Sequence, residues 1–171
     1  MMKLEDLIRD VVDFPEKGIV FKDITPLLQS PEGLRESVNR MQEGLKDLDF
    51  DLVVGPESRG FLFGVPIAYN LNKGFVPVRK PGKLPYKTIS QDYDLEYGSS
   101  TIELHIDAIK PGQKVVIVDD LLATGGTTRA MIDLIEKMGG EIVKIVYLIE
   151  LEFLKGIELF EGYNVSSLIK Y

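Results

Sequence analysis

The 171-residue sequence has no cysteine and no tryptophan, and it contains a single histidine. Without cysteine there can be no disulfide framework and no thiolate chemistry, which is typical of proteins from a reducing compartment. No apolar run approaches the roughly 18 residues of a membrane span, and the N-terminal residues mix charges with apolar side chains, unlike a signal peptide. These absences predict a cytoplasmic protein without a membrane partner.

Positive charge is also scarce, because 20 Lys and Arg residues face 27 Asp and Glu residues, for a formal net charge of -7. A protein that binds nucleic acid needs a basic stripe to neutralise phosphates, and this chain offers none. Any anion site must therefore be local. The length and the hydrophobic content of 44% suit one globular domain over residues 1–171, with a single core.

The most informative stretch is residues 115–128, in which four apolar β-branched residues are followed by two carboxylates. A Gly/Thr loop and an apolar pattern of helical period come next, which predicts a strand, a loop and a helix. A strand buried on both faces of a parallel sheet has this composition. Asp119 and Asp120 then lie at its carboxyl end, where open α/β sheets bind their ligands.

The loop after these carboxylates can bind a phosphate through its backbone N–H groups and hydroxyls, and a helix starting near Gly126 adds its positive end. Its members are Ala123, Thr124, Gly125, Gly126 and Thr127. We expect Thr127 to contribute both a hydroxyl to the phosphate and a cap to the helix. Acidic groups beside a phosphate make sense when they accept hydrogen bonds from hydroxyls of the same ligand or approach its magnesium, so the motif predicts a ribose-phosphate site.

This loop has two other possible interpretations. A Walker A loop requires a lysine after the glycines, and this sequence has none. A plain left-handed turn before a capped helix would explain Gly125, Gly126 and Thr127, but it gives no reason for the two preceding carboxylates.

The rest of the chain alternates between strand and helix patterns, which predicts an α/β fold with a mainly parallel sheet flanked by helices. The spacing of apolar residues predicts a helix over residues 4–12, and Ser30 with Pro31 marks the start of another. The remaining expected elements are strands at 51–54, 74–80, 101–106 and 143–151, a helix at 61–72 interrupted by Pro66, a short helical segment at 153–160, and an edge strand at 165–169.

Four basic residues, Arg79, Lys80, Lys83 and Lys87, gather within nine positions of this acidic chain. A solvated mobile loop would accommodate them, but neutralisation of a pyrophosphate explains their density better. Arg59, after another predicted strand, is either a surface arginine or a bidentate anion ligand, and we favour the second. His105 lies in an alternating strand and is expected to be exposed, without a partner and non-catalytic.

With these residues in view, the run at 115–128 resembles the phosphoribosyl-pyrophosphate (PRPP) binding motif of type I phosphoribosyltransferases. The amino-acid sequence of this run is similar to that of the adenine-specific members, and further matches extend over nearly the whole chain. The resemblance implies a small N-terminal hood (residues 1–30), a flexible catalytic loop (about 80–100) and a homodimer. It also implies transfer of the 5-phosphoribosyl group from PRPP to N9 of adenine, giving AMP and pyrophosphate in purine salvage. Mg²⁺ would be the cofactor, held mainly by PRPP and not by dedicated protein ligands.

The resemblance also implies roles for individual residues. Asp119 and Asp120 would hold the ribose hydroxyls, the loop 123–127 would hold the 5-phosphate, and Glu96 and Arg59 would be catalytic, with Glu96 as the acid/base next to the purine imidazole ring. The pyrophosphate group comprises Glu57, Ser58, Arg59, Arg79, Lys80 and Lys83, with a cis peptide between Glu57 and Ser58. The adenine group comprises Val20, Phe21, Lys22 and Leu121, with the base lying on Phe21 and read by the backbone of Val20 and Lys22.

Backbone readout would favour adenine, because a carbonyl accepts from its 6-amino group and an N–H donates to N1. A 6-oxo purine cannot satisfy this pair, and an unpaired buried group costs about 1–3 kcal/mol. One alternative function is therefore that of a sister enzyme, meaning a related phosphoribosyltransferase that uses hypoxanthine, guanine or xanthine. Another is a PRPP- or nucleotide-sensing regulator without turnover, which would usually carry a DNA-binding module that this acidic chain has no room for.

Overall fold

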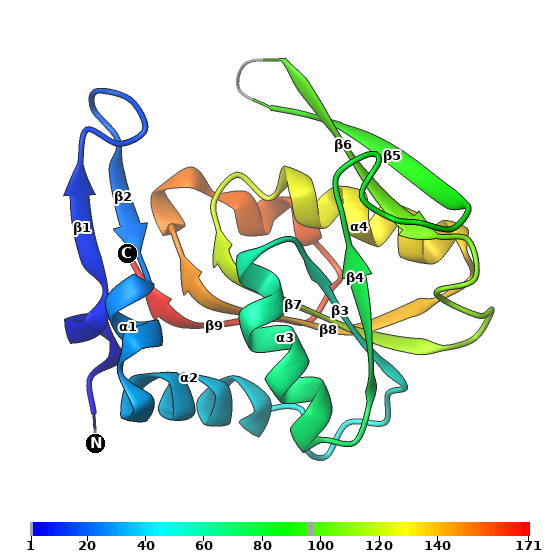
Figure 1. Cartoon of the computed structure of the whole chain (residues 1–171), viewed down its shortest axis with the longest axis horizontal. Helices are drawn as coiled ribbons and strands as arrows, with labels where there is room; N and C mark the ends of the chain where they lie inside the picture. Colours follow the sequence, from blue (N-terminus) through cyan, green and yellow to red (C-terminus); the bar gives the residue numbers. More distant parts are fainter. Residues whose placement is uncertain (1, 96–97) are drawn as a thin grey trace.

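The computed structural model describes residues 2–95 and 98–171, and its centre is a five-stranded parallel sheet (Figure 1). The strand order is β4-β3-β7-β8-β9, and every neighbouring pair is parallel. The predicted α/β class is therefore confirmed, with β9 at the edge of the sheet. The strands are β3 (Leu52–Pro56), β4 (Gly74–Val78), β7 (Lys114–Leu122), β8 (Glu141–Glu150) and β9 (Val165–Lys170).

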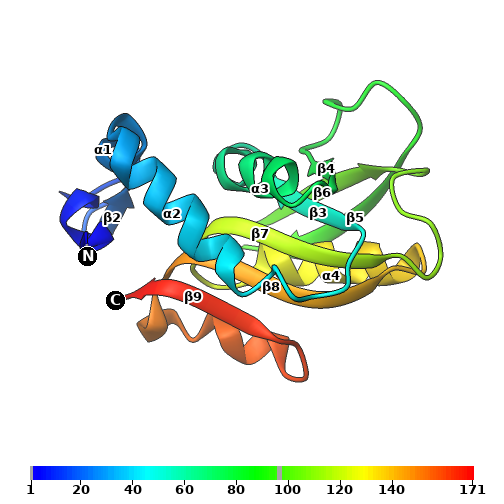
Figure 2. The same cartoon turned by 90° about the horizontal axis from the view of Figure 1, so that it is seen from below.

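Helices cover both faces of this sheet (Figure 2). One face carries α2 (Pro31–Glu43) and α3 (Arg59–Asn70), and the other carries α4 (Gly126–Lys137). Consecutive side chains of a strand point to opposite faces, so Val116 and Val118 of β7 enter the core under α2 and α3 while Val115 and Ile117 enter the core under α4. All four are fully buried, which explains why this strand is a continuous apolar run.

The predicted start of α2 is confirmed, since the Oγ of Ser30 accepts a hydrogen bond of 3.0 Å from the N–H of Gly33. The helix α3 runs through Pro66 as a single element. A five-residue helix, α1 (Thr25–Gln29), precedes α2 and was not predicted, because so short a segment shows no apolar periodicity.

The predicted helix over residues 4–12 was wrong. The segment forms a short 3-10 helix, η1 (Leu4–Leu7), and then β1 (Arg9–Val12), which pairs antiparallel with β2 (Val20–Asp23). The single turn of η1 already brings Leu4 into the core, and the backbone after it is used for pairing with β2. These two strands and their loop lie beside the main sheet, within the region predicted to be a hood, and we refer to them as the hood (Figure 1).

A second two-stranded sheet consists of β5 (Thr88–Asp94) and β6 (Ser99–His105), and it stands over α4 (Figure 1). The strand β5 lies within the region expected to be a flexible loop, and it was not predicted because its polar sequence has no apolar run. The mobility of this region stays a prediction. His105 is half-buried and accepts a hydrogen bond of 3.3 Å from the N–H of Tyr86, so its expected exposure without a partner was wrong.

After β8 the chain forms two 3-10 helices, η2 (Glu152–Leu154) and η3 (Gly156–Phe160), on the same face as α4 (Figure 2). They correspond to the short helical segment predicted at 153–160. No helix within residues 2–95 and 98–171 is long and apolar enough to cross a membrane.

Candidate active site

Asp119 and Asp120 lie at the carboxyl end of β7, as predicted. Asp120 is 4% exposed, and its backbone N–H donates a hydrogen bond of 2.8 Å to Oδ1 of Asp119. Burial and the neighbouring charge of Asp120 raise the pKa of the Asp119 carboxyl well above its ordinary value. The Asp119 carboxylate is therefore costly to ionise, so this corner favours a ligand that brings hydroxyl donors or positive charge.

Arg59, the first residue of α3, reaches across to these carboxylates. Its Nε lies 2.9 Å from Oδ2 of Asp120, and its guanidinium carbon lies 5.2 Å from the centre of the Phe21 ring in the hood. The ion pair lacks hydrogen-bond geometry, so Oδ2 of Asp120 has no hydrogen-bond donor among the residues that the structure describes. An acceptor that is buried and unsatisfied by the protein is available for a donor on a ligand.

The loop between β7 and α4 encloses a pocket of about 90 Å³, lined by Asp119 and residues 121–128. Gly125 has φ +86°, a left-handed conformation that glycine adopts without strain, and it turns the chain into α4. The first N–H groups of a helix lack intrahelical partners and attract anions. This small pocket can thus hold one phosphate group.

Two details of this loop differ from the sequence analysis. The N-cap of α4 is Gly125, and no side chain within residues 2–95 and 98–171 caps the helix, so the expected capping by Thr127, its second residue, was wrong. Thr128 was missed although it belongs to the same run. It is buried, it lines the pocket, and its Oγ1 accepts a hydrogen bond from the hydroxyl of Tyr147 on β8.

A second pocket, of about 200 Å³, lies between the ends of β3 and β4 and the β5–β6 hairpin. Oε1 of Glu57 accepts hydrogen bonds from the N–H of Lys80 at 2.7 Å and from Nε of Arg79 at 3.2 Å. These bonds, that of Lys80 first, lower the pKa of the Glu57 carboxyl, which therefore stays ionised and orients the start of the basic loop. The lining residues are Pro56, Glu57, Val78, Arg79, Lys80, Tyr93, Ile102 and Thr127.

This second pocket brings together part of the predicted pyrophosphate group. The peptide between Glu57 and Ser58 is cis, as predicted. Thr127 lines both pockets, which joins the predicted phosphate and pyrophosphate sites at one residue. Tyr93 also lines it, a contact that sequence reasoning missed because β5 itself was missed. Arg59 instead forms an ion pair with Asp120 and a cation–π contact with Phe21, and Lys83 is exposed on the loop beyond the pocket.

The hood contains a third pocket, of about 250 Å³, lined by Val11, Phe14, Phe21 and Asp23. The rings of Phe14 and Phe21 meet edge to face with centroids 5.2 Å apart, which fixes the orientation of the predicted base platform. Asp23 is tied to Arg9 at 2.6 Å across the two hood strands.

The other members of the predicted adenine group are spread around this platform. Val20 is 44% exposed beside Phe21 on β2. Lys22 is fastened by its side chain, since Nζ lies 2.7 Å from Oδ1 of Asp10 and 3.8 Å from the centre of the Tyr171 ring. Leu121 lines the phosphate pocket and not the hood pocket. Glu96, the predicted acid/base, lies outside the described residues.

Comparisons with known proteins agree with this geometry. Residues 26–159 match the family model described as phosphoribosyl transferase domain. The chain is 62% identical to adenine phosphoribosyltransferase from Lachnoclostridium phytofermentans over 171 residues, which cover 100% of this chain and 98% of that relative.

Solved structures show the same similarity. The adenine phosphoribosyltransferase from Thermoanaerobacter pseudethanolicus superposes with a TM-score of 0.96 at 52% identity, over 99% of this chain and 100% of that one. The enzyme from Saccharomyces cerevisiae, solved with adenine and an imino-altritol bisphosphate, superposes with a TM-score of 0.89 at 37% identity, over 96% of this chain and 95% of that one. The similarity therefore extends over the hood and the hairpin as well as the central sheet.

Proposed function

The chain belongs to the adenine phosphoribosyltransferase family, and from this premise we propose that it transfers the 5-phosphoribosyl group of PRPP to N9 of adenine, giving AMP and pyrophosphate. The main observation behind the proposal is that buried Asp120 and half-buried Asp119 lie beside a phosphate-sized pocket at the end of β7. One ligand, a ribose phosphate, supplies hydroxyls to the carboxylates and a phosphate to the pocket.

In this function the loop 123–127 binds the 5-phosphate through the N-terminus of α4, and the carboxylates bind the ribose hydroxyls. The unsatisfied Oδ2 of Asp120 would accept a hydrogen bond from one hydroxyl, and Asp119 from another. Such contacts fix C1 of the ribose in place, so the reaction gains its rate from positioning and from electrostatics.

The reaction forms the N9–C1 bond and breaks the bond between C1 and the pyrophosphate oxygen. The leaving pyrophosphate would occupy the second pocket, where Arg79 and Lys80 are held by Glu57 and supply positive charge. Ser58, Arg59 and Lys83 belong to the same proposed group, by family resemblance. Arg59 is close enough to Asp120 to act on the ribose side of the breaking bond.

Adenine is proposed to stack on Phe21, with the backbone of Val20 and Lys22 reading its edge and Leu121 on the side of the phosphate loop. The edge-to-face contact with Phe14 keeps the Phe21 ring in one orientation. As N9 bonds to C1, the imidazole ring of the base gains positive character and its proton must leave. Glu96 is proposed to manage that proton.

Mg²⁺ is proposed as the cofactor, bound mainly by PRPP. No group of three or more His, Cys, Asp or Glu side chains in residues 2–95 and 98–171 could hold a metal ion. The pair Asp119 and Asp120 nevertheless fits a cation that brings its own ligands, since Mg²⁺ usually combines one or two carboxylates with substrate phosphates. When bound, the ion would offset the negative charge of the departing pyrophosphate.

A homodimer and a cytoplasmic location are also part of the proposal. The outer face of α3 presents Leu62, Val65 and Tyr69, which are 42%, 47% and 84% exposed and follow a helical spacing. An apolar helix face of this kind is suited to contact a second copy of the chain. Analytical ultracentrifugation would measure the oligomeric state, and a monomer at micromolar concentration would contradict this part. The cytoplasmic location, predicted from the sequence, is consistent with the family, and cell fractionation would test it.

The decisive experiment incubates the purified protein with PRPP and Mg²⁺, together with adenine, hypoxanthine, guanine or xanthine in separate reactions. Chromatography then identifies the nucleotide that forms. AMP from adenine alone supports the proposal, and a product from a 6-oxo purine indicates the sister enzyme. Binding of PRPP without any nucleotide product would point to the sensing regulator.

A further inference from the structure

The segment that follows β8 lies directly behind the phosphate loop. A Cβ built on Gly156, the first residue of η3, would overlap the carbonyl oxygen of Ala123 and lie 3.0 Å from the carbonyl carbon of Thr124 and from Cδ1 of Leu122. Since Cβ atoms essentially never approach other heavy atoms closer than 3.0 Å, only glycine fits at position 156. The loop and η3 are therefore in backbone-to-backbone contact.

The same contact is seen from the side of the loop. A Cβ on Gly125 would lie 2.8 Å from the carbonyl oxygen of Gly156, 3.1 Å from Cζ of Phe160 and 3.3 Å from Cδ1 of Leu159. Phe160 is 2% exposed and belongs to the core under α4. The back of the phosphate loop thus rests on η3, and η3 is anchored in the core.

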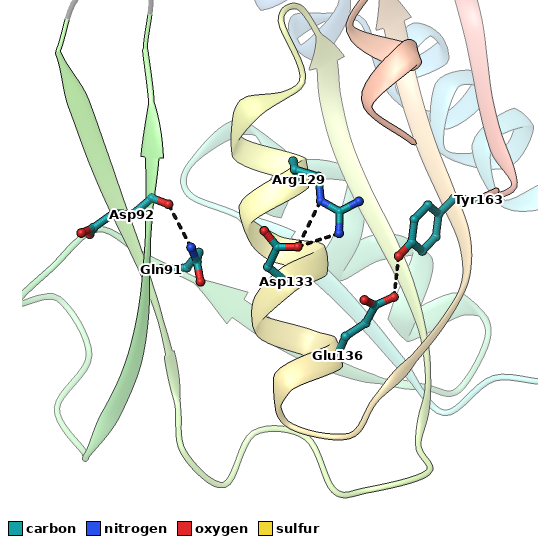
Figure 3. A network of polar contacts seen from close by, with 6 residues as sticks. All are labelled: Gln91, Asp92, Arg129, Asp133, Glu136 and Tyr163. Carbon is teal, nitrogen blue, oxygen red and sulfur yellow. Dashed lines mark hydrogen bonds and ion pairs between the residues drawn. The ribbon is translucent and has the colours of Figure 1, made fainter. Parts of the chain in front are cut away.

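Polar contacts hold the chain after η3 against α4 as well (Figure 3). The hydroxyl of Tyr163 donates a hydrogen bond to Oε1 of Glu136, and the guanidinium carbon of Arg129 lies 5.7 Å from the centre of the Tyr163 ring. Arg129 itself is held by two hydrogen bonds, of 2.6 Å and 3.1 Å, to Oδ1 of Asp133. The segment is consequently fixed to the same helix whose N-terminus faces the phosphate pocket.

We propose that Gly156 and Phe160 are positioning residues for the phosphate loop, setting the place of its backbone N–H groups and thereby the affinity for the 5-phosphate of PRPP. The inference rests on the proposed function in naming PRPP as the substrate, but the property it concerns is the binding of a ribose phosphate. A misplacement on the order of 1 Å can cost about 10²-fold in rate at a site that works by positioning. A methyl group at position 156 would force such a displacement on the loop or on η3.

The test compares Gly156→Ala with wild type by isothermal titration with ribose 5-phosphate, and by the KM values for PRPP and adenine. We expect affinity for ribose 5-phosphate to fall by about tenfold or more and kcat/KM for PRPP by up to about 10²-fold, with the KM for adenine changed less than twofold. The φ of Gly156 lies outside the left-handed region, so the substitution acts through its added Cβ and not through backbone strain.

Gly140→Ala is the matched control. Its Cβ would lie 2.8 Å from Cγ2 of Ile135 and 3.0 Å from Cγ2 of Ile109, so this position is also too crowded for a methyl group, although less so than position 156, and it lies beyond the opposite end of α4. It should lower the melting temperature without changing the affinity for ribose 5-phosphate. Equal losses of affinity in both variants would mean that general destabilisation explains the effect, and the inference would be wrong.

If Gly156→Ala does not fold, Phe160→Leu approaches the same loop through Gly125 and should weaken ribose 5-phosphate binding selectively. Unchanged affinity in the folded Gly156→Ala, or in Phe160→Leu when it alone folds, overturns the inference. Failure of the proposed function is recognised separately, because wild type would then bind ribose 5-phosphate but form no AMP. The pattern among the variants would in that case still decide whether η3 positions the loop.

Discussion

The hydrogen bond between Tyr147 and Thr128 allows a quantitative prediction. The Tyr147 side chain is fully buried and Thr128 is 3% exposed, so water cannot replace either partner. Tyr147→Phe leaves the Thr128 hydroxyl buried without its partner, which costs about 1–3 kcal/mol. For a chain of this size, 1 kcal/mol corresponds to about 2–4 °C, so the melting temperature should fall by about 2–12 °C.

Removing both partners should cost less than removing one. Thr128→Val combined with Tyr147→Phe replaces the two hydroxyls by apolar groups, and the stability should return to within about 1 kcal/mol of wild type. Burial raises the pKa of the Tyr147 hydroxyl far above its ordinary value of 10.0, so that group keeps its proton. The cost of Tyr147→Phe should therefore be the same between about pH 6 and pH 9.

The assay is denaturant unfolding followed by circular dichroism, on all four proteins of the cycle at one protein concentration. The coupling free energy between the two sites is expected to lie between about 0.5 and 3 kcal/mol. Strictly additive single and double effects would refute the reasoning. A cost below about 0.5 kcal/mol for Tyr147→Phe would do so too, since surface substitutions alone reach that value.

Three further predictions concern the site itself. Thr127→Ala should raise the KM for PRPP more than that for adenine while changing stability by less than about 0.5 kcal/mol, because Thr127 lines the phosphate pocket but does not cap α4; equal effects on both substrates would contradict its assignment. Glu96→Leu should lower kcat by about 10²–10⁴ with PRPP affinity unchanged, and Glu96→Gln should fall between; wild-type single-turnover rates in both variants would show that the residue is an ordinary loop carboxylate. Asp119→Asn should stabilise the free protein at neutral pH but weaken PRPP binding. Because the pKa of the Asp119 carboxyl is raised in the folded protein, wild type has its full stability at low pH and loses stability as the pH rises above the ordinary value of 3.8. The stability gain should therefore vanish in a melt below that pH, and a gain independent of pH would argue against burial of the charge.

The strand, loop and helix that begin at residues 115–128 could be predicted from the sequence because the residues that indicate them are neighbours. The run from Val115 to Val118, the carboxylates after it and the glycines of the loop are consecutive, so one strand, one loop and one helix follow from a single window. Ser30 and Pro31 marked the start of α2 for the same reason, as a cap and a first-turn proline are neighbours.

The features that were missed depend on partners distant in sequence. The segment from Arg9 to Val12 has the spacing of a helix and becomes a strand because β2 offers it a backbone partner. Thr128 accepts its hydrogen bond from Tyr147, which lies 19 residues away in the sequence. The phosphate loop packs against Gly156, which lies more than 30 residues beyond Ala123. Neither residue carries a local pattern that distinguishes it from an ordinary core tyrosine or an ordinary turn glycine.

The strand order has a consequence for where any ligand of this fold must bind. From β3 the chain proceeds outward through α3 to the edge strand β4, whereas from β7 it proceeds through α4 to β8, in the opposite direction along the sheet. The two connections leave on opposite faces, so the loops after β3 and β7 diverge and a crevice opens between the carboxyl ends of these neighbouring strands. Glu57 and Asp119 stand on its two sides. The location of the site is thus a property of the topology, while the side chains along the crevice determine which molecule enters it.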